Sequence, residues 1–541
     1  MAPTAKSEPE MSEAFVSDLA SIVGSERVLT DETDRLAYNC DCSPRGILRA
    51  RGRVLEPHQP KAVVQPAHEG DVQALVQWAR KTGTALVAYG AGSGVCLGAV
   101  ADAESVIVDL KRLDRIREVD EENLLVRAES GVLGVLLQQE LERLGYTMGH
   151  FPSSLYCSSL GGYLAARSAG QFSSRYGKIE DMVASMRVVA GTGERLETAP
   201  DSTAERPGKE AAEYGPNLTQ VFVGNEGTLG LITEATLHIE PLPNHRYYRG
   251  FQFAELSEAL EAIRRIMQTG LKPAVVRLYD PFDTLLKGGG SEGASGDATQ
   301  SWSDRLREFA EDALSDELLR ELEGTVTGVR NAVVGGLVGR PMLVNSLVDR
   351  FASKSLLLVG FEGRSTLVEE EADWAFELLS RYGVDLGAEP GLRWLQHRYD
   401  ASYMQSPLFD TGAFVDTMEV STTWGNLENL YRRVRGALQP HVLVLAHFSH
   451  VYEEGSSIYF TFVGHEPNTE SSLRLHQQAW DDALRAVSEA SGSITHHHGV
   501  GALKANWTET DHLGGGQQFR ALKSAFDPDT ILNPGKVYPV E

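Results

Sequence analysis

A strand of small and apolar residues that runs directly into a glycine-rich loop constrains this chain most. Residues 85–90 read ALVAYG, and the loop reads Gly90-Ala91-Gly92-Ser93-Gly94. Successive small residues let backbone N–H groups point at one anion, which suits a pyrophosphate. The loop lacks the G-x-x-x-x-G-K-[ST] pattern, and no helix with an acidic ribose-binding residue follows it. A P-loop and a Rossmann NAD site are therefore disfavoured, and a plain glycine-rich turn is the alternative.

Two later segments share this small-residue character. Residues 150–183 are dense in Ser, Gly and Ala for a helix–loop stretch, which would let backbone approach a flat ligand closely. Residues 225–235 read NEGTLGLITEA, a glycine turn that enters a strand. A tight helix-packing face is the alternative for the first of these segments.

The chain has 541 residues, which is more than one hydrophobic core usually stabilises, so we expect more than one domain. Strand and helix patterns predict an N-terminal helical or extended segment over 1–59 and a first domain over 60–242. They also predict a second domain over 243–495 and a C-terminal segment over 496–541. The low-complexity stretch 288–301, GGGSEGASGDATQS, is predicted to be a mobile loop.

Charge and cysteine content narrow the class of protein. Fifty Lys and Arg against 75 Asp and Glu give a net charge of −25, so no basic stripe is available for nucleic-acid phosphates. Four cysteines cannot form a disulfide framework and are typical of a reducing compartment. The sequence has no apolar run long enough to span a bilayer and no apolar N-terminal signal core. We therefore expect a cytoplasmic enzyme without a nucleic-acid partner.

Histidines gather in the C-terminal half. Seven of the 15 lie between His447 and His498, and His496, His497 and His498 are adjacent. Successive side chains of a strand alternate between faces, so these three cannot all face one metal unless the chain bends. At a bend they would line a pocket, where histidine can transfer protons or, as a cation, hold phosphate. A solvated turn is the alternative.

Taken in order, the three small-residue segments resemble the FAD-binding domain of the vanillyl-alcohol oxidase / p-cresol methylhydroxylase (PCMH) superfamily. The resemblance covers nearly the whole chain from about residue 60. It implies an α+β fold, in which a PCMH-type FAD-binding domain of two α+β subdomains carries an α+β cap. The cap is expected to be ferredoxin-like, with an antiparallel sheet.

The resemblance also implies the cofactor contacts. The first loop contains no histidine that could tether the flavin, so non-covalent FAD is expected. Cys96 and Cys157 lie close to the implied flavin segments, and we expect them to be packing residues. The implied FAD contacts are Gly90, Gly92, Ser93, Val95, Pro152, Ser158, Gly162, Ala169, Gly170, Tyr176, Gly177, Glu226 and Ile232.

Two branches of the superfamily compete for the C-terminal half. In the FAD-dependent 2-hydroxy-acid dehydrogenases, two His and a Glu hold a divalent metal that grips the substrate. Here His450 matches the first ligand, but Tyr459 stands where the second His would lie, and His497 where the Glu would lie. A phenol is a poor ligand for a zinc-like ion, so we expect no metal site.

The other branch, the alkylglycerone-phosphate synthases of ether-lipid synthesis, is matched by more motifs. These are GHFPSSL (149–155), VRLYD (276–280), MEVSTTW (418–424), IYF (458–460) and HHHGVGALKANW (496–507). The resemblance implies that a fatty alcohol replaces the acyl group of acyl-dihydroxyacetone phosphate, through an adduct at flavin N5 and without net redox. An FAD-dependent dehydrogenase or oxidase of a 2-hydroxy acid or alcohol is the alternative.

The implied roles match physical needs of that reaction. A phosphate dianion needs a fixed cation, which Arg277 can supply bidentately, with Lys504 as a neighbouring cation. Acid–base groups are implied at His150, Tyr459, His496, His497 and His498. Without the family match, Arg277 would be interpreted as a surface residue and Tyr459 as cross-strand packing.

Partners follow from broader features. We expect a small-molecule lipid or hydroxy-acid substrate and a homodimer. The apolar helical insert over 325–349 suits an acyl tunnel or a peripheral membrane contact, and on periodicity alone it suits cap-domain core equally well. The net charge of −25 argues against purely electrostatic attachment to anionic lipid.

Overall fold

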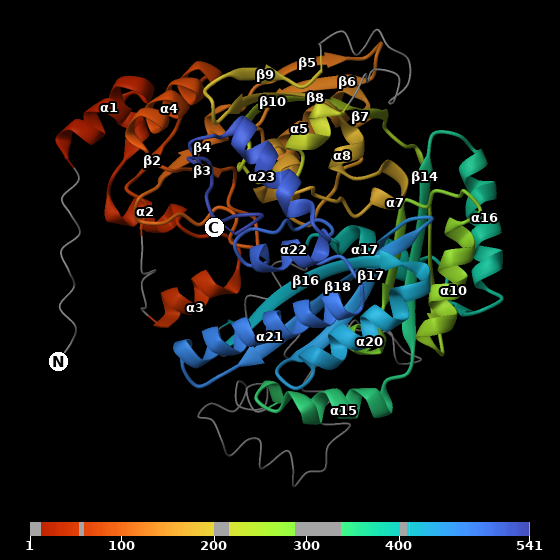
Figure 1. The fold of residues 1–541 in the computed structure, drawn as a ribbon. Coiled ribbons are helices and arrows are strands. Elements are labelled where there is room, and N and C mark those ends of the chain that lie inside the picture. Colours follow the sequence, from red (N-terminus) through yellow and green to blue (C-terminus); the bar gives the residue numbers. More distant parts are fainter. Residues whose placement is uncertain are drawn as a thin grey trace.

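The computed structural model describes residues 12–52, 59–199, 216–286, 337–400, 408–409 and 412–539. Within these residues the strands form sheets of four, five, two and seven strands, with helices packed against them (Figure 1). The predicted α+β class is confirmed. The predicted loop 288–301 and residues 325–336 of the apolar insert lie outside the described residues. No described helix is both long and apolar enough to cross a membrane.

The first sheet carries the glycine-rich loop at the end of one of its strands. Its order is β1-β2-β4-β3, and it is parallel except for β1. The strands are β1 (Val28–Leu29), β2 (Ala62–Val64), β3 (Leu86–Tyr89) and β4 (Val106–Asp109), with α1 (Glu13–Val23) and α4 (Glu69–Thr82) packed on them. Helix α4 is capped by Gly83, whose φ of 68° lies in the left-handed region that glycine adopts readily.

The second sheet is antiparallel, with the order β5-β6-β10-β8-β9. Its strands are β5 (Ile116–Asp120), β6 (Leu125–Glu129), β8 (Val183–Ala190), β9 (Arg195–Glu197) and β10 (Gly230–His238). Helices α5 (Gly134–Leu144), α6 (Leu160–Ala165) and α8 (Ile179–Met182) contribute to its core. A short pair, β7 (Tyr146–Thr147) and β11 (Glu240–Pro241), leads out of this domain toward the cap.

The cap sheet is antiparallel, with the order β15-β12-β14-β13-β17-β18-β16. Its strands are β12 (His245–Phe253), β13 (Val275–Tyr279), β14 (Ser355–Gly363), β15 (Val384–Asp385), β16 (Ala413–Thr423), β17 (Leu443–Val451) and β18 (Gly455–His465). Helices α10 (Leu256–Met267), α16 (Leu367–Leu379), α20 (Leu427–Leu438) and α21 (Thr469–Glu489) share one core with this sheet (Figure 1).

Strand alternation gives the cap sheet two different faces. In β18, the fully buried Ile458 and Phe460 belong to the core that the helices share. Tyr459 lies between them and therefore points to the opposite face. The same alternation in neighbouring strands places Arg277, His447 and Glu419 on that face, because each lies between residues of the helix-side core.

The described part of the apolar insert belongs to the cap. In α15 (Pro341–Phe351), Val344 and Val348 are buried with Leu337 against residues of β16, β17 and β18. Met342 of the same helix is 65% exposed. The described residues thus support cap core, and membrane contact stays a prediction.

The C-terminal segment returns to the first sheet. Leu532 forms a parallel bridge with Leu86 of β3. The backbone N–H of Asn533 donates to the Leu86 carbonyl at 2.8 Å. Residues after α21 therefore run from the cap back to the strand that carries the glycine-rich loop.

Candidate active site

Two of the small-residue segments meet directly after β3. Ser93 Oγ lies 2.6 Å from Ser158 Oγ. A Cβ on Gly90 would lie 2.5 Å from Ser159 Oγ and 3.9 Å from the Gly162 Cα. The absence of a side chain at residue 90 thus leaves room for the Ser159 hydroxyl beside the loop.

Glu226 brings the third segment to the same place. Its φ of 49° lies in the left-handed region. At the adjacent Gly227, a Cβ would lie 3.0 Å from the Ala88 Cβ of β3. Asn533 Nδ2 donates to the Gly98 carbonyl at 3.1 Å and to the Glu226 carbonyl at 2.6 Å. Residues 90–98, 158–162 and 225–227 therefore form one backbone-lined cradle.

The other implied FAD contacts have varied surroundings. Gly170 permits a close backbone approach, since a Cβ there would lie 2.5 Å from the Phe151 nitrogen. Tyr176 of α7 (Ser173–Tyr176) donates its hydroxyl to Glu362 Oε1 of β14 at 2.7 Å. The Ile232 side chain packs in the core of the second sheet. Val95 packs against the cap core, Pro152 and Ala169 are buried, and Gly177 has a φ of 81°.

The chemistry of the cradle fits FAD. Glycine and serine backbone lines it, so N–H groups can approach a pyrophosphate without intervening side chains. Ser130 Oγ is buried beside it and has no hydrogen-bond partner among the described residues. A Cβ on Gly161 would lie 2.8 Å from the Ser130 Cβ, which places this hydroxyl at the cradle. A buried hydroxyl is costly to leave unpaired, so a polar ligand suits this position.

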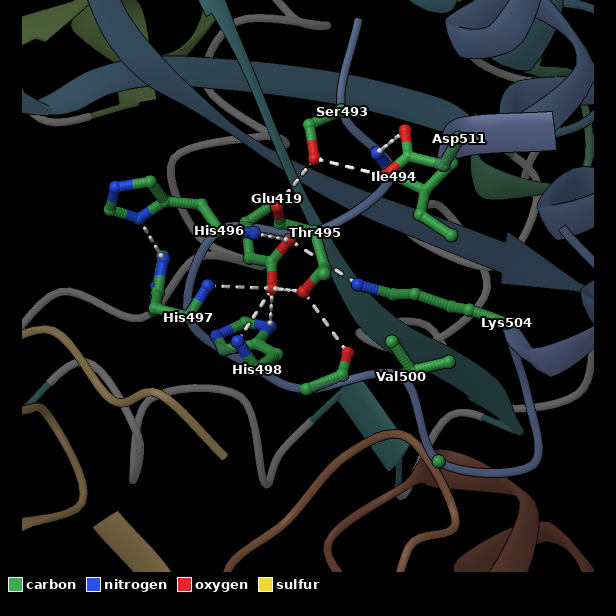
Figure 2. Close-up of polar contacts among 12 residues, drawn as sticks. Glu419, Ser493, Ile494, Thr495, His496, His497, His498, Val500, Lys504 and Asp511 are labelled. Carbon is green, nitrogen blue, oxygen red and sulfur yellow. Dashed lines mark hydrogen bonds and ion pairs between the residues drawn. The ribbon is translucent and has the colours of Figure 1, made fainter. Parts of the chain in front are cut away.

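The triple-histidine segment follows α21 and is held by Glu419 of β16 (Figure 2). Glu419 is fully buried and accepts hydrogen bonds from the backbone N–H groups of His496, His497 and His498 at 3.1, 3.2 and 2.6 Å. Lys504 Nζ, also fully buried, lies 3.3 Å from Glu419 Oε2. Burial raises the pKa of Glu419, but Lys504, His498 and these hydrogen bonds outweigh it, so the pKa lies below its usual value.

The histidines form a neutral cluster. His496 Nδ1 and His497 Nδ1 are 3.0 Å apart, and a hydrogen bond between them needs one donor and one acceptor. The His450 ring lies beside both, with centroids 5.4 and 4.5 Å away. Burial lowers the pKa values of His450, His496, His497 and His498 below the usual histidine range. Neutral rings suit proton transfer better than anion binding.

Arg277 of β13 supplies a fixed cation on the same face of the cap sheet. Its Nη2 lies 2.8 Å from His447 Nε2. A guanidinium can only donate, so Nε2 must accept and a neutral His447 carries its proton on Nδ1, 3.6 Å from Asp283 Oδ2. Arg277 Nε is buried and has no hydrogen-bond partner among the described residues. A donor is therefore left for an anionic ligand.

Tyr459 stands in the middle of a row across the cap sheet. It lies directly opposite Glu419 on β16 and His447 on β17. Its ring stacks on His447, with centroids 4.7 Å apart, and meets the His498 ring edge-on at 5.4 Å. Burial raises the pKa of Tyr459 to about 12, so its phenol is a proton donor at neutral pH.

Two implied site residues are engaged elsewhere. His150 is fully buried in the FAD-binding domain, with Nε2 3.1 Å from Ser168 Oγ and its ring against Tyr163. Burial lowers the pKa of His150 to about 3. Neither partner belongs to the triple-histidine cluster. Lys504 forms its internal ion pair with Glu419, so its ammonium is already committed.

Sequence reasoning gave no role to Glu419 or His447. Glu419 did leave a signal, because it is the acid within the apolar run MEV and a buried carboxylate needs partners. His447 lies in the apolar strand HVLVLAHFS, where alternation fixes its face but not its neighbours. In the described residues, no group of three His, Cys, Asp or Glu is arranged to hold a metal.

Two family models match this chain. The FAD binding domain matches residues 60–199, and the C-terminal domain of FAD linked oxidases matches residues 242–537. The chain belongs to the FAD-linked oxidase family. Its cofactor is FAD, which confirms that prediction.

Relatives of this chain include synthases and dehydrogenases. The alkyldihydroxyacetonephosphate synthase of Dictyostelium discoideum is 28% identical over 545 residues, which are 98% of this chain and 82% of that protein. The D-2-hydroxyglutarate dehydrogenase of Stutzerimonas stutzeri (strain A1501) is 25% identical over 542 residues, which are 97% and 99% of the two chains.

Solved structures agree with the sequence relatives. An alkyldihydroxyacetonephosphate synthase superposes on this chain with a TM-score of 0.72 at 25% identity, over 98% of this chain and 86% of that one. Substrate-bound p-cresol methylhydroxylase gives a TM-score of 0.68 at 17% identity, over 96% of both chains, and shows the shared fold. The predicted synthase-like membership of the PCMH superfamily is confirmed.

Proposed function

We propose that this FAD-linked protein is a transferase of the alkylglycerone-phosphate (alkyldihydroxyacetonephosphate) synthase type. It would replace the acyl group of acyl-dihydroxyacetone phosphate by a fatty alcohol and so form an ether-lipid precursor. The observation that carries this proposal is the Arg277 guanidinium. Its buried Nε has no hydrogen-bond partner among the described residues. The side chain lies on the same face of the cap sheet as the stacked rings of His447 and Tyr459.

Arg277 is suited to bind the substrate phosphate. A guanidinium presents several N–H donors in one plane, and a phosphate dianion accepts two of them side by side. The contact with His447 holds the Arg277 side chain in place before substrate arrives. Because the four clustered histidines are neutral, Arg277 is the group on this face that we assign to the phosphate charge.

Acid–base work falls to Tyr459 and the neutral histidines. Bound FAD supplies an electron-poor ring that can accept and return an electron pair during the exchange. When the fatty alcohol attacks, its hydroxyl proton must pass to a base, and the neutral His497 or His498 can accept it. The departing fatty acid leaves as a carboxylate, and the protonated Tyr459 can donate a hydrogen bond to its developing charge.

An oxidoreductase acting on a 2-hydroxy acid or alcohol is the second candidate. The dehydrogenase relative favours it, and so does the general chemistry of Arg277, because a carboxylate can occupy the same donors as a phosphate. Against it, the described residues contain no clustered metal ligands of the kind that this branch uses to grip its substrate.

One experiment separates the two candidates. The purified yellow holoprotein is mixed with acyl-dihydroxyacetone phosphate and a long-chain alcohol, and the ether product and the flavin absorbance are followed together. We expect ether formation without lasting bleaching of the flavin. In a parallel anaerobic assay, lactate, glycolate and 2-hydroxyglutarate should leave the flavin oxidised. Bleaching by a hydroxy acid, with no ether product, would replace the first proposal by the second.

The remaining expectations are parts of the same proposal. The domain limits at residues 59, 242 and 495, the homodimer and the peripheral membrane contact stay predictions.

A further inference from the structure

Buried carboxylates from two domains hold the backbone of residues 496–501. Glu419 of the cap accepts from the N–H groups of residues 496–498, and Thr495 Oγ1 donates to it at 2.8 Å (Figure 2). Glu226 of the FAD-binding domain accepts from the Val500 N–H at 2.6 Å and from the Gly501 N–H at 2.9 Å. The N–H donors of residues 496–498, 500 and 501 are thus satisfied by side chains instead of by a strand or helix.

We propose that Glu419 is a positioning residue that sets His497 and His498 against Tyr459. This inference rests on the proposed function in one respect, that the histidine cluster is the acid–base site. Glu419 acts through the backbone and does not itself touch substrate.

Strand register explains how one carboxylate can set this geometry. Glu419 and Tyr459 are directly opposite on β16 and β18, and directly opposed residues have Cβ atoms about 5 Å apart. The carboxylate that holds the histidine backbone and the phenol that meets the His498 ring are therefore fixed to the same pair of strands. A shift of either strand would move both groups together, so their relative position is preserved.

Burial argues that the carboxylate has a role beyond filling space. A fully buried carboxylate and ammonium are expensive to desolvate, and an apolar pair of similar volume is often at least as stable. Glu419 and Lys504 are both fully buried. What an apolar pair cannot do is accept hydrogen bonds from consecutive backbone N–H groups of an irregular bend.

Glu226 ties the following turn to the cradle. Gly499 and Gly501 have φ of 78° and 57°, and a Cβ on Gly499 would lie 2.8 Å from Glu226 Oε1. The turn can therefore lie against the Glu226 carboxylate only with glycine at that position. Glu419 thus holds the histidine segment to the cap strands, and Glu226 holds the following turn to the FAD-binding domain.

The test compares Glu419→Gln with the double variant Glu419→Gln/Lys504→Met. The single change leaves the Lys504 ammonium buried without its carboxylate and is expected to lower stability. The double change removes both charges, so its thermal midpoint and FAD content should return close to wild type. Glu428→Gln, on the exposed first turn of α20, is the matched control and should match wild type throughout.

In the double variant we expect kcat for ether formation to fall about tenfold while KM changes less than about threefold. That split marks a lost geometry for proton transfer, because uniform loss of binding would raise KM. A fall in kcat smaller than about threefold, with FAD content restored, would overturn the proposal. If the double variant does not retain FAD, Thr495→Val decides instead. It removes one donor to Glu419 and keeps both charges, and an unchanged kcat there would overturn the proposal.

A second measurement does not depend on turnover. Histidine-labelled holoprotein is titrated by NMR, with the His498 resonance assigned through a His498→Gln sample. The Glu419 charge raises the pKa of His498, so Glu419→Gln should move its titration to lower pH. The titratable and charged groups that act on His498 are Glu419, Lys504, Asp416, Tyr459, His450, His496 and His497.

This measurement separates failure of the positioning role from failure of the proposed function. If wild type turns over neither set of substrates, the proposed function fails, and the NMR titration still decides the role of Glu419. An unchanged His498 titration in Glu419→Gln would show that the carboxylate does not act on this histidine, and it would overturn the proposal.

Discussion

Arg277 Nη2 donates to His447 Nε2 over 2.8 Å between the adjacent strands β13 and β17. This one contact fixes the position of the cation and the tautomer of the imidazole. It also links Arg277 to Tyr459, because the Tyr459 ring stacks on His447. A substitution of Arg277 should therefore weaken phosphate binding directly and affect proton transfer only indirectly, through His447 and Tyr459.

Arg277→Ala should weaken binding of phosphorylated substrate selectively. Loss of a charge-assisted pair of hydrogen bonds costs about 2–3 kcal/mol, which corresponds to a rise in KM of about 30- to 150-fold. Arg277→Lys keeps the charge without the planar donors, so its KM should lie between those of wild type and Arg277→Ala. Arg249→Ala, at a half-buried arginine of the same sheet that pairs with Asp385, is the control. Steady-state kinetics with phosphorylated and unphosphorylated substrates would test this, and an equal loss on both would contradict a phosphate role.

Tyr459→Phe should lower kcat about 100-fold or more while FAD content stays unchanged. The substitution keeps the ring that stacks on His447 and removes the hydrogen-bond donor to the departing carboxylate, and a donor aimed at developing charge typically contributes this much. Tyr247→Phe, on strand β12 of the same sheet, is the matched control. Rates and flavin absorbance are measured on the same samples. A variant that retains wild-type kcat would remove Tyr459 from the acid–base assignment.

Gly170→Ala should reduce the retention of FAD. The added Cβ would lie 2.5 Å from the Phe151 nitrogen, and because that atom is backbone, the segment 150–151 must move. Gly436→Ala in α20 is the control, since a Cβ there meets nothing within 4 Å. The ratio of flavin to protein absorbance after gel filtration checks the prediction. Full flavin content in Gly170→Ala would show that this close approach is not needed for FAD retention.

Stability should fall as the pH rises from 5 to 8, partly because of Asp280. Burial raises the pKa of this fully buried carboxyl to about 7 from a usual value of 3.8. The folded state therefore holds the proton more tightly, so the contribution is present below the unfolded pKa and is lost as pH rises through about 7. Between pH 5 and 8 the loss is about 3 kcal/mol.

Asp280→Asn has no proton to lose at this position, so its unfolding free energy should vary less with pH than that of wild type. The comparison is made by denaturant unfolding of the holoprotein at pH 5 and pH 8. Burial also raises the pKa values of Glu226 and Asp41, to about 7 and about 6. Their contributions to the pH dependence of stability are the same in wild type and in Asp280→Asn, so they cancel in the comparison. The exposed Asp385→Asn is the control. Parallel pH profiles for wild type and Asp280→Asn would contradict the raised pKa.

The fold could be predicted because its signals are local. The glycine-rich loop after a strand, the order of the small-residue segments and the alternation around Tyr459 are properties of neighbouring residues. Period-two alternation also gives the face of a strand on which each polar side chain lies, as it does for Tyr459 between Ile458 and Phe460.

The partners of the site residues could not be predicted in this way. His150 and Lys504 have residue types suited to acid–base work and phosphate binding, yet Lys504 lies in an ion pair with Glu419 and His150 contacts Ser168. Nothing near either residue in the chain distinguishes a buried partner from an open site, because burial depends on segments that pack from elsewhere.

The sequence by itself therefore determined the α+β class, the FAD cofactor and which residue types could carry the chemistry. Only the tertiary structure decided that Glu419 holds the histidine segment and that Arg277 meets His447. The reason is physical: strand register and the return of the C-terminal segment bring together groups that are 77 and 170 residues apart, and no periodicity within one segment specifies such a pairing.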